Sequence, residues 1–181
     1  MSRVVFAFGI LAGLVVALPM MAIMILLSPA TFMAGGVVYG FATMILALVA
    51  VFLGIKHYRD RALGGVIRFG TAFLVGLGIS TVASVIYALG WEVSLAASGL
   101  DFAEVYNKSL LEAARARGAA DDELRTIAEK GADFAIMYSN PLYRVPLSFI
   151  EMFPVGVVIS LISAALLRNS RLLPARQAGV S

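Results

Sequence analysis

The chain has 181 residues, of which 61% are hydrophobic and 14% are charged, and its formal net charge is +3. Soluble domains carry about 45–50% apolar and about 25% charged residues. The composition therefore excludes an ordinary water-soluble domain, which must cover a large surface with polar groups, and predicts a membrane protein. The absence of cysteine excludes disulfide frameworks, thiolate nucleophiles and cysteine metal ligands.

Four long apolar stretches predict an all-α membrane protein with four transmembrane helices, over about 4–27, 33–55, 67–91 and 143–167. Each stretch reaches the roughly 20 residues that a helix needs to cross the hydrocarbon core. Pro19 lies inside the first stretch, where neighbouring helices tolerate a proline in a membrane. The first stretch is too long for the apolar region of a cleaved signal peptide, and no Ala-x-Ala site follows it. We therefore expect this helix to be retained.

Basic residues gather on one side of these four spans. The N-terminal end, the 56–68 connection and the C-terminal tail hold eight basic residues and one acid, whereas the segment 92–144 holds six basic residues and nine acids. Because positively charged loops are retained in the cytoplasm, we expect both termini there and residues 28–32 and 92–144 outside. The expected cytoplasmic basic loop contains Lys56, Arg59, Arg61 and Arg68.

The polar segment between the third and fourth spans predicts an extracytoplasmic helical hairpin, over about 101–117 and 121–139. Apolar residues recur at helical spacing in both halves. Gly118 is expected to end the first helix, Asp121 to cap the second, and Asn140-Pro141 to begin the last span. The two apolar stripes cover each other or are covered by a partner protein. Residues 1–181 are thus predicted to form a single four-helix membrane domain with an insertion at 92–142.

Small residues recur at every fourth position in three spans and predict close helix packing. The stripe on the third and fourth spans consists of Ala72, Gly76, Ser80, Ser84, Gly156, Ser160 and Ala164. Small residues let helix backbones approach closely in lipid, so we predict that the third and fourth helices pack along this stripe. The pattern fits a bundle within one chain or a dimer. For Gly9 and Gly13 in the first span, chance enrichment is the alternative.

Glu151 lies inside the fourth predicted span and is the sharpest candidate for chemistry. A charged acid at mid-membrane costs about 2.5–3.5 kcal/mol, so such a residue usually faces the bundle interior or a wet cavity. Tyr87 and Trp91 end the third span at the same outer level, and Arg144 precedes Glu151 on the same helical face. We predict a polar cluster of Glu151 with Tyr87, Trp91 or Arg144. It serves as a structural hydrogen-bonded acid or as a proton or ligand site.

Motifs for catalysis, cofactors or metals do not emerge from the sequence. His57 is the only histidine, so no histidine pair can bind a metal and no serine has a histidine base. No glycine-rich loop matches a phosphate-binding pattern. We therefore expect no catalytic residues and no cofactor. We also expect no nucleic-acid partner, because the basic residues lie at the membrane rim. The expected partners are the lipid bilayer and either further copies of the chain or another membrane protein.

Five blocks of sequence together carry a family resemblance. They are Gly54-Ile55-Lys56-x-Tyr58-Arg59-Asp60, Gly64-Gly65-x-Ile67-x-Phe69, Ala83-Ser84-x-Ile86-Tyr87-x3-Trp91-Glu92, Asn140-Pro141-Leu142-Tyr143-Arg144 and Glu151-x-Phe153-Pro154-Val155-Gly156. In these blocks the chain resembles bacterial domain-of-unknown-function family 4199. The resemblance covers nearly the whole chain and implies a four-helix bacterial membrane protein with an external helical insertion. It implies no established activity, so no catalytic residues carry over.

Three functions are consistent with these patterns. The first is a non-enzymatic scaffold or accessory subunit of the bacterial inner membrane, indicated by the small-residue stripes and the external arm. The second is a small oligomeric transporter or channel in which Glu151 is an intramembrane protonatable site. A membrane enzyme acting on lipid ranks last, because candidate nucleophiles and bases are not paired along the sequence.

Overall fold

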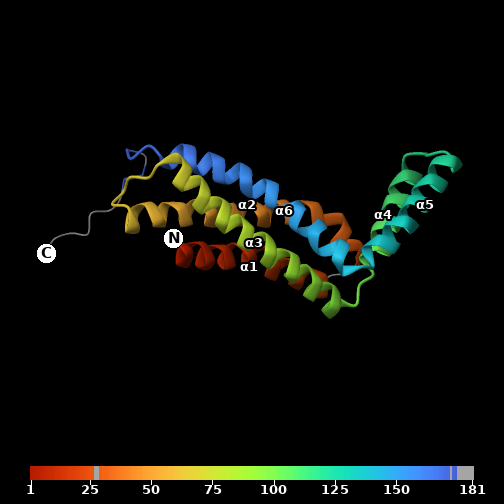
Figure 1. The fold of residues 1–181 in the computed structure, drawn as a ribbon. Coiled ribbons are helices and arrows are strands. Elements are labelled where there is room, and N and C mark those ends of the chain that lie inside the picture. Colours follow the sequence, from red (N-terminus) through yellow and green to blue (C-terminus); the bar gives the residue numbers. More distant parts are fainter. Residues whose placement is uncertain (27–28, 172, 175–181) are drawn as a thin grey trace.

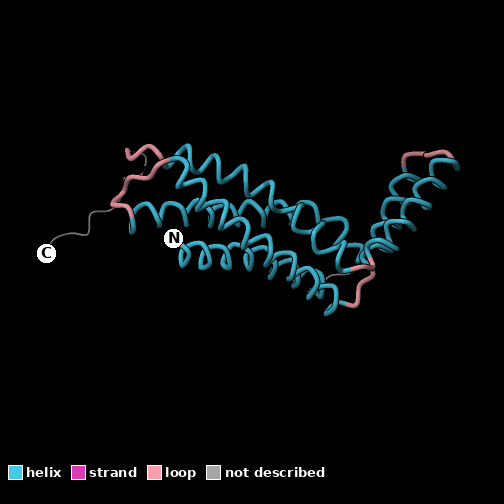
Figure 2. Tube along the Cα trace, in the orientation of Figure 1, coloured by secondary structure: helices cyan, strands magenta, loops and turns pink. Residues whose placement is uncertain are grey.

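The computed structural model describes residues 1–26, 29–171 and 173–174, and within these residues the chain forms six α-helices and no β-strand (Figure 1). They are α1 (Ser2–Leu26), α2 (Pro29–Ala62), α3 (Phe69–Ser98), α4 (Phe102–Ala116), α5 (Asp121–Tyr138) and α6 (Pro141–Leu167). Helices α1, α2, α3 and α6 lie side by side in an elongated bundle. Helices α4 and α5 project as an arm from the end opposite the N-terminus. Loops are confined to the ends of the helices (Figure 2).

Three helices of the described part, α1, α3 and α6, are long and apolar enough to cross a membrane. Large apolar side chains such as Leu18, Leu74 and Val158 are more than half exposed on the outside of these helices. A soluble monomer rarely exposes so much apolar surface, whereas hydrocarbon covers it at no cost. The second predicted span lies within α2, where the side chains of residues 29–37 are outside the described part.

The core follows the length of the bundle as three clusters of buried side chains. From the N-terminal end of the bundle to the arm, these clusters contain Ile55, Val75 and Leu167, then Val16, Ala83 and Met152, then Met24, Trp91 and Tyr138. Helix α3 contributes to all three clusters and packs against both α1 and α6. Residues that α3 presents to its neighbours therefore decide how the bundle holds together.

The basic segment predicted as a loop over 56–68 is helical as far as Ala62, so that part of the prediction is wrong. Lys56 and Asp60 form an ion pair of 2.5 Å inside α2. Opposite charges four residues apart stabilise a helix, and this pairing extends α2 beyond the apolar stretch. Two glycines in the left-handed region then turn the chain, at φ 64° for Gly64 and 91° for Gly65.

Helix α3 is longer than the predicted third span, which ended near residue 91. It continues to Ser98 and ends at Gly99, whose φ of 63° lies in the left-handed region. The additional turns are covered by the arm, because Leu95 packs against the cluster around Tyr138. Hydropathy alone does not register such packing.

The start of α2 also differs from prediction. Residues 28–32 were expected to form an external connection, but α2 begins at Pro29, the position in a helix where proline is most favoured. Residues 27–28, which include the end of the first predicted span, lie outside the described residues.

Capping residues set the limits of the arm. The carboxylate of Asp101 accepts a hydrogen bond from the Glu104 N–H at 3.0 Å and starts α4. Gly118, at φ 76°, follows the end of α4 as predicted. The predicted Asp121 cap is wrong by one residue: Ala120 is the N-cap of α5 and makes no side-chain bond. Asp121 is instead the first helical residue, where the positive end of the helix dipole stabilises its negative charge.

The transition from α5 to α6 agrees with the sequence prediction. Asn140 caps α6, and its side-chain oxygen accepts a hydrogen bond from the Leu142 N–H at 3.0 Å. Pro141 occupies the first helical position, where its missing N–H costs nothing. The arm therefore joins α6 through a single sharp turn.

Candidate functional site

The small-residue stripe lies at the buried contact between α3 and α6. Its members are Ala72, Gly76, Ser80, Ser84, Gly156, Ser160 and Ala164, and each is buried. The hydroxyl oxygens of Ser80 and Ser160 are 3.3 Å apart, and the Ser160 hydroxyl donates to the Gly156 carbonyl at 2.7 Å. A methyl group on Gly76 would lie 2.7 Å from Ser160 Oγ, and one on Gly156 would lie 2.6 Å from Ser80 Cβ. Only small residues permit this approach.

Gly9 and Gly13 lie at the contact between α1 and α3. A methyl group on Gly9 would be 2.5 Å from Val82 Cβ, and one on Gly13 would be 2.5 Å from Ile86 Cβ. These glycines allow the β-branched side chains of α3 to pack onto the backbone of α1. Both positions thus have a packing role in the bundle.

A small cavity lies where all four bundle helices meet. The centre of a water molecule could occupy a volume of about 10 Å³ in this cavity. Its lining includes Ala12, Val51, Ser84 and Met152. This space suits about one water molecule. None of the residues that line it is ionisable. The cavity is therefore too small and too apolar to bind a metabolite.

Tyr87 and Glu151 form a hydrogen-bonded pair between α3 and α6. The Tyr87 hydroxyl donates to Glu151 Oε2 at 3.3 Å. Tyr87 is 3% exposed, whereas Glu151 is exposed at the surface of the bundle. Glu151 lies about 15 Å along the axis of α6 from its first residue, from the rise of about 1.5 Å per residue. Glu151 thus lies at the boundary of the bundle: the residue is exposed on an apolar helix, and its carboxylate accepts a hydrogen bond from the buried Tyr87.

Arg144 and Trp91 do not contact Glu151 but belong to a separate group, here called the elbow cluster: Trp91, Glu92, Tyr138 and Arg144. Arg144 Nε donates to Glu92 Oε1 at 2.6 Å and Nη2 donates to Oε2 at 2.5 Å. Nη1 of the same guanidinium donates to the Tyr138 carbonyl at 2.8 Å. Trp91 Nε1 donates to the Tyr138 hydroxyl at 2.6 Å. The elbow cluster thus joins α3, α5 and α6 where the arm leaves the bundle.

Tyr138 is the centre of the elbow cluster. The Arg144 guanidinium carbon lies 5.5 Å from the centroid of the Tyr138 ring, a cation–π distance. The rings of Phe102 and Phe134 lie 5.4 and 5.0 Å from the same ring. Burial raises the pKa of Tyr138 to about 12, against the lowering effects of the Trp91 hydrogen bond and the Arg144 cation. The phenol therefore stays neutral and acts as a structural contact.

The predicted cytoplasmic basic residues separate into buried and exposed groups at the other end of the bundle. Arg59 is fully buried, and its guanidinium donates to Asp60 Oδ1 at 2.7 Å and to the carbonyls of Leu167 and Leu173. A cation at the end of α6 complements the negative end of the helix dipole. Arg59 is therefore a structural residue that holds the end of α6 against α2.

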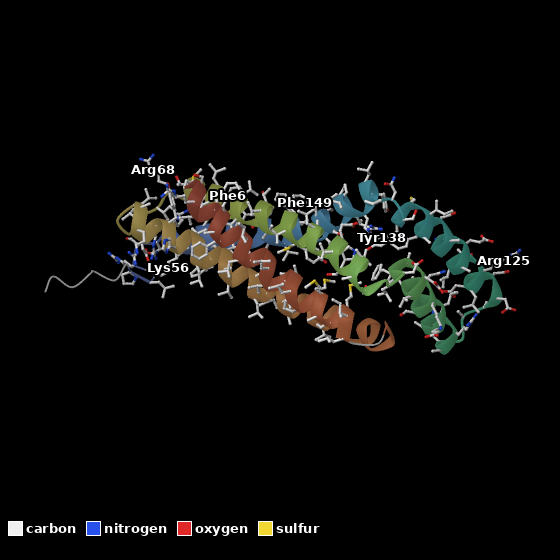
Figure 3. All side chains as sticks on the ribbon, turned by 90° about the horizontal axis from the view of Figure 1, so that it is seen from below. Phe6, Lys56, Arg68, Arg125, Tyr138 and Phe149 are labelled. Atoms are coloured by element: carbon white, nitrogen blue, oxygen red, sulfur yellow. The ribbon has the colours of Figure 1, made fainter. Side chains whose placement is uncertain are left out.

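The other basic residues of this end reach the surface. Figure 3 shows Lys56 and Arg68 at the end of the bundle away from the arm, and Arg61 and Arg68 are exposed. Burial raises the pKa of Asp60, but hydrogen bonds from Arg59 and Lys56 outweigh that effect and the net pKa is lowered. Asp60 is thus a carboxylate at neutral pH and offsets part of the positive charge.

Sequence patterns did not predict the Arg144–Glu92 pair or the buried position of Arg59. Opposite charges at the same outer level of two spans were a usable signal for Arg144 and Glu92. For Arg59 there was no signal, because the sequence does not show that the end of α6 returns to α2. His57 is exposed and its ring lies 5.5 Å from that of Phe8. Within the described ranges, no three His, Asp or Glu side chains could together hold a metal ion.

The apolar helices, their lipid-compatible exterior and the small-residue packing together define a helical membrane protein. Residues 7–169 match the family model described as "Protein of unknown function (DUF4199)", and the chain belongs to that family. The match confirms the resemblance drawn from the sequence blocks. No curated protein and no solved structure shows significant similarity to the chain.

Proposed function

We propose that the chain is a bacterial inner-membrane protein with four spans, both termini in the cytoplasm and the α4–α5 hairpin outside. The charge distribution supports this topology, because Lys56 and Arg68 lie at one end of the bundle and the arm, with Arg125 near its tip, at the other (Figure 3). Helix α2 supplies the second span through its apolar stretch over 33–55, which brings the number of spans to four. Consecutive bundle helices run in opposite directions along the bundle (Figure 1), so with α2 crossing they would cross the membrane in alternate senses.

Within this membrane, we propose that the chain is a non-enzymatic scaffold or accessory subunit that binds another membrane chain through the outward face of α6. This face consists of Leu147, Glu151, Pro154, Val158 and Ile162, all of which are exposed. Its members recur at helical spacing, so they form one continuous strip along the span. A second helix laid along this strip would contact all five residues.

The exposed position of Glu151, an acidic residue on an apolar helix, is the observation that carries this proposal. Facing hydrocarbon, a charged acid costs about 2.5–3.5 kcal/mol near mid-membrane. Among the described residues, Tyr87 provides a hydrogen bond to one carboxyl oxygen, Oε2. A neighbouring membrane chain would replace hydrocarbon with a polar partner at Glu151. Interhelical hydrogen bonds of this kind contribute about 0.6–2 kcal/mol.

A second copy of the chain is the first partner to test. The chain has no native cysteine, so Val158→Cys would provide a single thiol on the outward face of α6. We expect disulfide cross-linking of this variant in native membranes. Adding Glu151→Ala should weaken self-association by about 3- to 30-fold, the equivalent of one interhelical hydrogen bond. Glu151→Gln should retain association, because an amide still forms hydrogen bonds.

Leu74→Ala is the matched control, because Leu74 is 59% exposed on α3 and lies outside the outward face of α6. It should leave association unchanged. If Val158→Cys gives no cross-link, a photo-reactive side chain at the same position should cross-link a second membrane protein, again less so with Glu151→Ala. Absence of both products in native membranes would contradict the scaffold proposal.

Proton-coupled transport is the second candidate, and the Tyr87–Glu151 pair favours it as an ionisable group that reaches the surface of a span. The cavity inside the bundle has room for about one water molecule and does not by itself form a conduction path through one chain. Transport would therefore require an oligomer with Glu151 at the interface. Unchanged flux of every ion tested with Glu151→Gln in proteoliposomes would remove Glu151 as a coupling site.

A further inference from the structure

Four large side chains at the base of the arm form an exposed patch, here called the apolar collar. The collar consists of Ile136, Met137, Leu142 and Tyr143, with exposed fractions of 73%, 47%, 85% and 38%. Two of these residues belong to the last turn of α5 and two to the first turn of α6. The collar therefore surrounds the sharp turn at which the arm joins the bundle.

The elbow cluster fixes the position of the collar relative to the spans. Arg144 follows directly after Tyr143 and is bound to Glu92 of α3, while Tyr138 follows directly after Met137 and is bound to Trp91 of α3. Because both halves of the collar are next to residues anchored on α3, the collar cannot swing away with the tip of the arm. It stays at the level of the outer end of the spans.

The collar is continuous with the exposed apolar surface of α6. Leu147 and Ile150, in the next turns of α6, are 39% and 63% exposed. On the other side, Asp133 is exposed one turn before Ile136 on the same face of α5. The change from apolar to charged exposed residues therefore falls within α5, above the start of the last span predicted from hydropathy.

We propose that the apolar collar inserts into the boundary between headgroups and acyl chains of the adjacent leaflet, so that lipid anchors the base of the arm. Tyr143 is of the type that is enriched at this boundary, where its ring is apolar and its hydroxyl stays hydrated. Apolar side chains on a helix end buried in this zone add to membrane affinity in proportion to their area. The lipid-covered surface thus includes the last turn of α5, and the arm is held at a set angle.

Nitroxide labelling of the full chain tests this proposal directly, because the absence of native cysteine makes each engineered thiol unique. Ile136→Cys and Leu142→Cys would be labelled in nanodiscs of phosphatidylethanolamine and phosphatidylglycerol. Collisions with oxygen, which concentrates in lipid, would be compared with collisions with a water-soluble nickel chelate. Leu18→Cys, at a position of α1 that is 53% exposed, is the lipid-facing control, and Arg125→Cys, near the tip of the arm, is the water-facing control.

Both collar labels should shift toward oxygen access, as at Leu18, and away from the nickel access seen at Arg125. Nickel access at Ile136 like that at Arg125 would overturn the proposal, and so would exclusion of both reagents, which indicates a covering protein. A Leu18 label that favours nickel would instead refute the membrane span itself. Emission of Trp91, the single tryptophan, measured before the label is attached, reports whether each cysteine variant keeps the packing of the elbow cluster.

Discussion

At the scale of single residues, distances along the helices decide which of the four candidate site residues contact one another. These residues are Glu151, Arg144, Tyr87 and Trp91. Arg144 precedes Glu151 by seven positions on the same face of α6, which corresponds to about 10 Å along the axis. Glu92 lies within hydrogen-bond distance of the same guanidinium, at 2.6 Å, so the cation pairs there. Tyr87 lies at the level of Glu151 and is the candidate that reaches it.

The Arg144–Glu92 pair should contribute measurably to stability, because both side chains are mostly buried, at 15% and 22% exposed. Arg144→Met removes a two-point ion pair and the hydrogen bond to the Tyr138 carbonyl. We expect a loss of about 1.5–3 kcal/mol in the free energy of unfolding, the range for hydrogen bonds to charged groups. Denaturant unfolding in detergent, followed by Trp91 emission, measures it.

Arg125→Met is the control for this prediction. Arg125 forms an ion pair with Glu129 on the exposed surface of α5, with side chains 81% and 71% exposed. Pairs of that kind contribute about 0–1 kcal/mol, so the free energy of unfolding should change little. Equal destabilisation by the two variants would show that the elbow cluster does not hold the arm to the bundle.

At the scale of the helices, α3 determines the packing because it contacts α1 through residues with branched side chains and α6 through small ones. Lipid does not press helices together as water does, so close contact between small residues replaces the hydrophobic drive. The same close contact makes the stripe intolerant of added atoms, since the serine side chains of the facing helix lie too near for a methyl group.

Gly76→Ala and Gly156→Ala should each destabilise the bundle. The added methyl groups would lie 2.7 Å from Ser160 Oγ and 2.6 Å from Ser80 Cβ, and overpacking of this kind costs about 1–3 kcal/mol. Gly70→Ala is the matched control on α3, because a methyl group there meets nothing within 4 Å. Thermal unfolding in detergent should rank Gly70→Ala at or above the unsubstituted chain. A Gly76→Ala variant as stable as Gly70→Ala would contradict the close contact of α3 and α6.

The helices are more predictable from sequence than their ends. Apolar runs, together with Asn140-Pro141 and Gly118, gave the positions of α1, α3 and α6 and the end of α4, since these signals are local. The extension of α2 through the basic segment depends on the Lys56–Asp60 pair. The extension of α3 depends on contacts with the arm. A hydropathy profile predicts neither extension, because it averages over a window of residues and takes no account of contacts with distant residues.

At the scale of the whole molecule, the long axis of the bundle separates two chemically different ends. One end has exposed Arg61 and Arg68 and the buried Arg59, whereas the other has the arm with its excess of acids and the elbow cluster. A chain built this way has one favourable orientation in a membrane that retains basic residues on the inner side. The outward face of α6 and the apolar collar acquire their proposed partners only in that orientation.

Reporter fusions at residue 120, in the connection between α4 and α5, test the four-span orientation most directly. Alkaline phosphatase, which folds only outside the cytoplasm, should be active there, and a fluorescent protein that folds only in the cytoplasm should be dark. The same two reporters fused after residue 174 should give the opposite result. A fluorescent, phosphatase-inactive fusion at residue 120 would contradict the orientation and, with it, the proposed positions of the arm, the collar and Glu151.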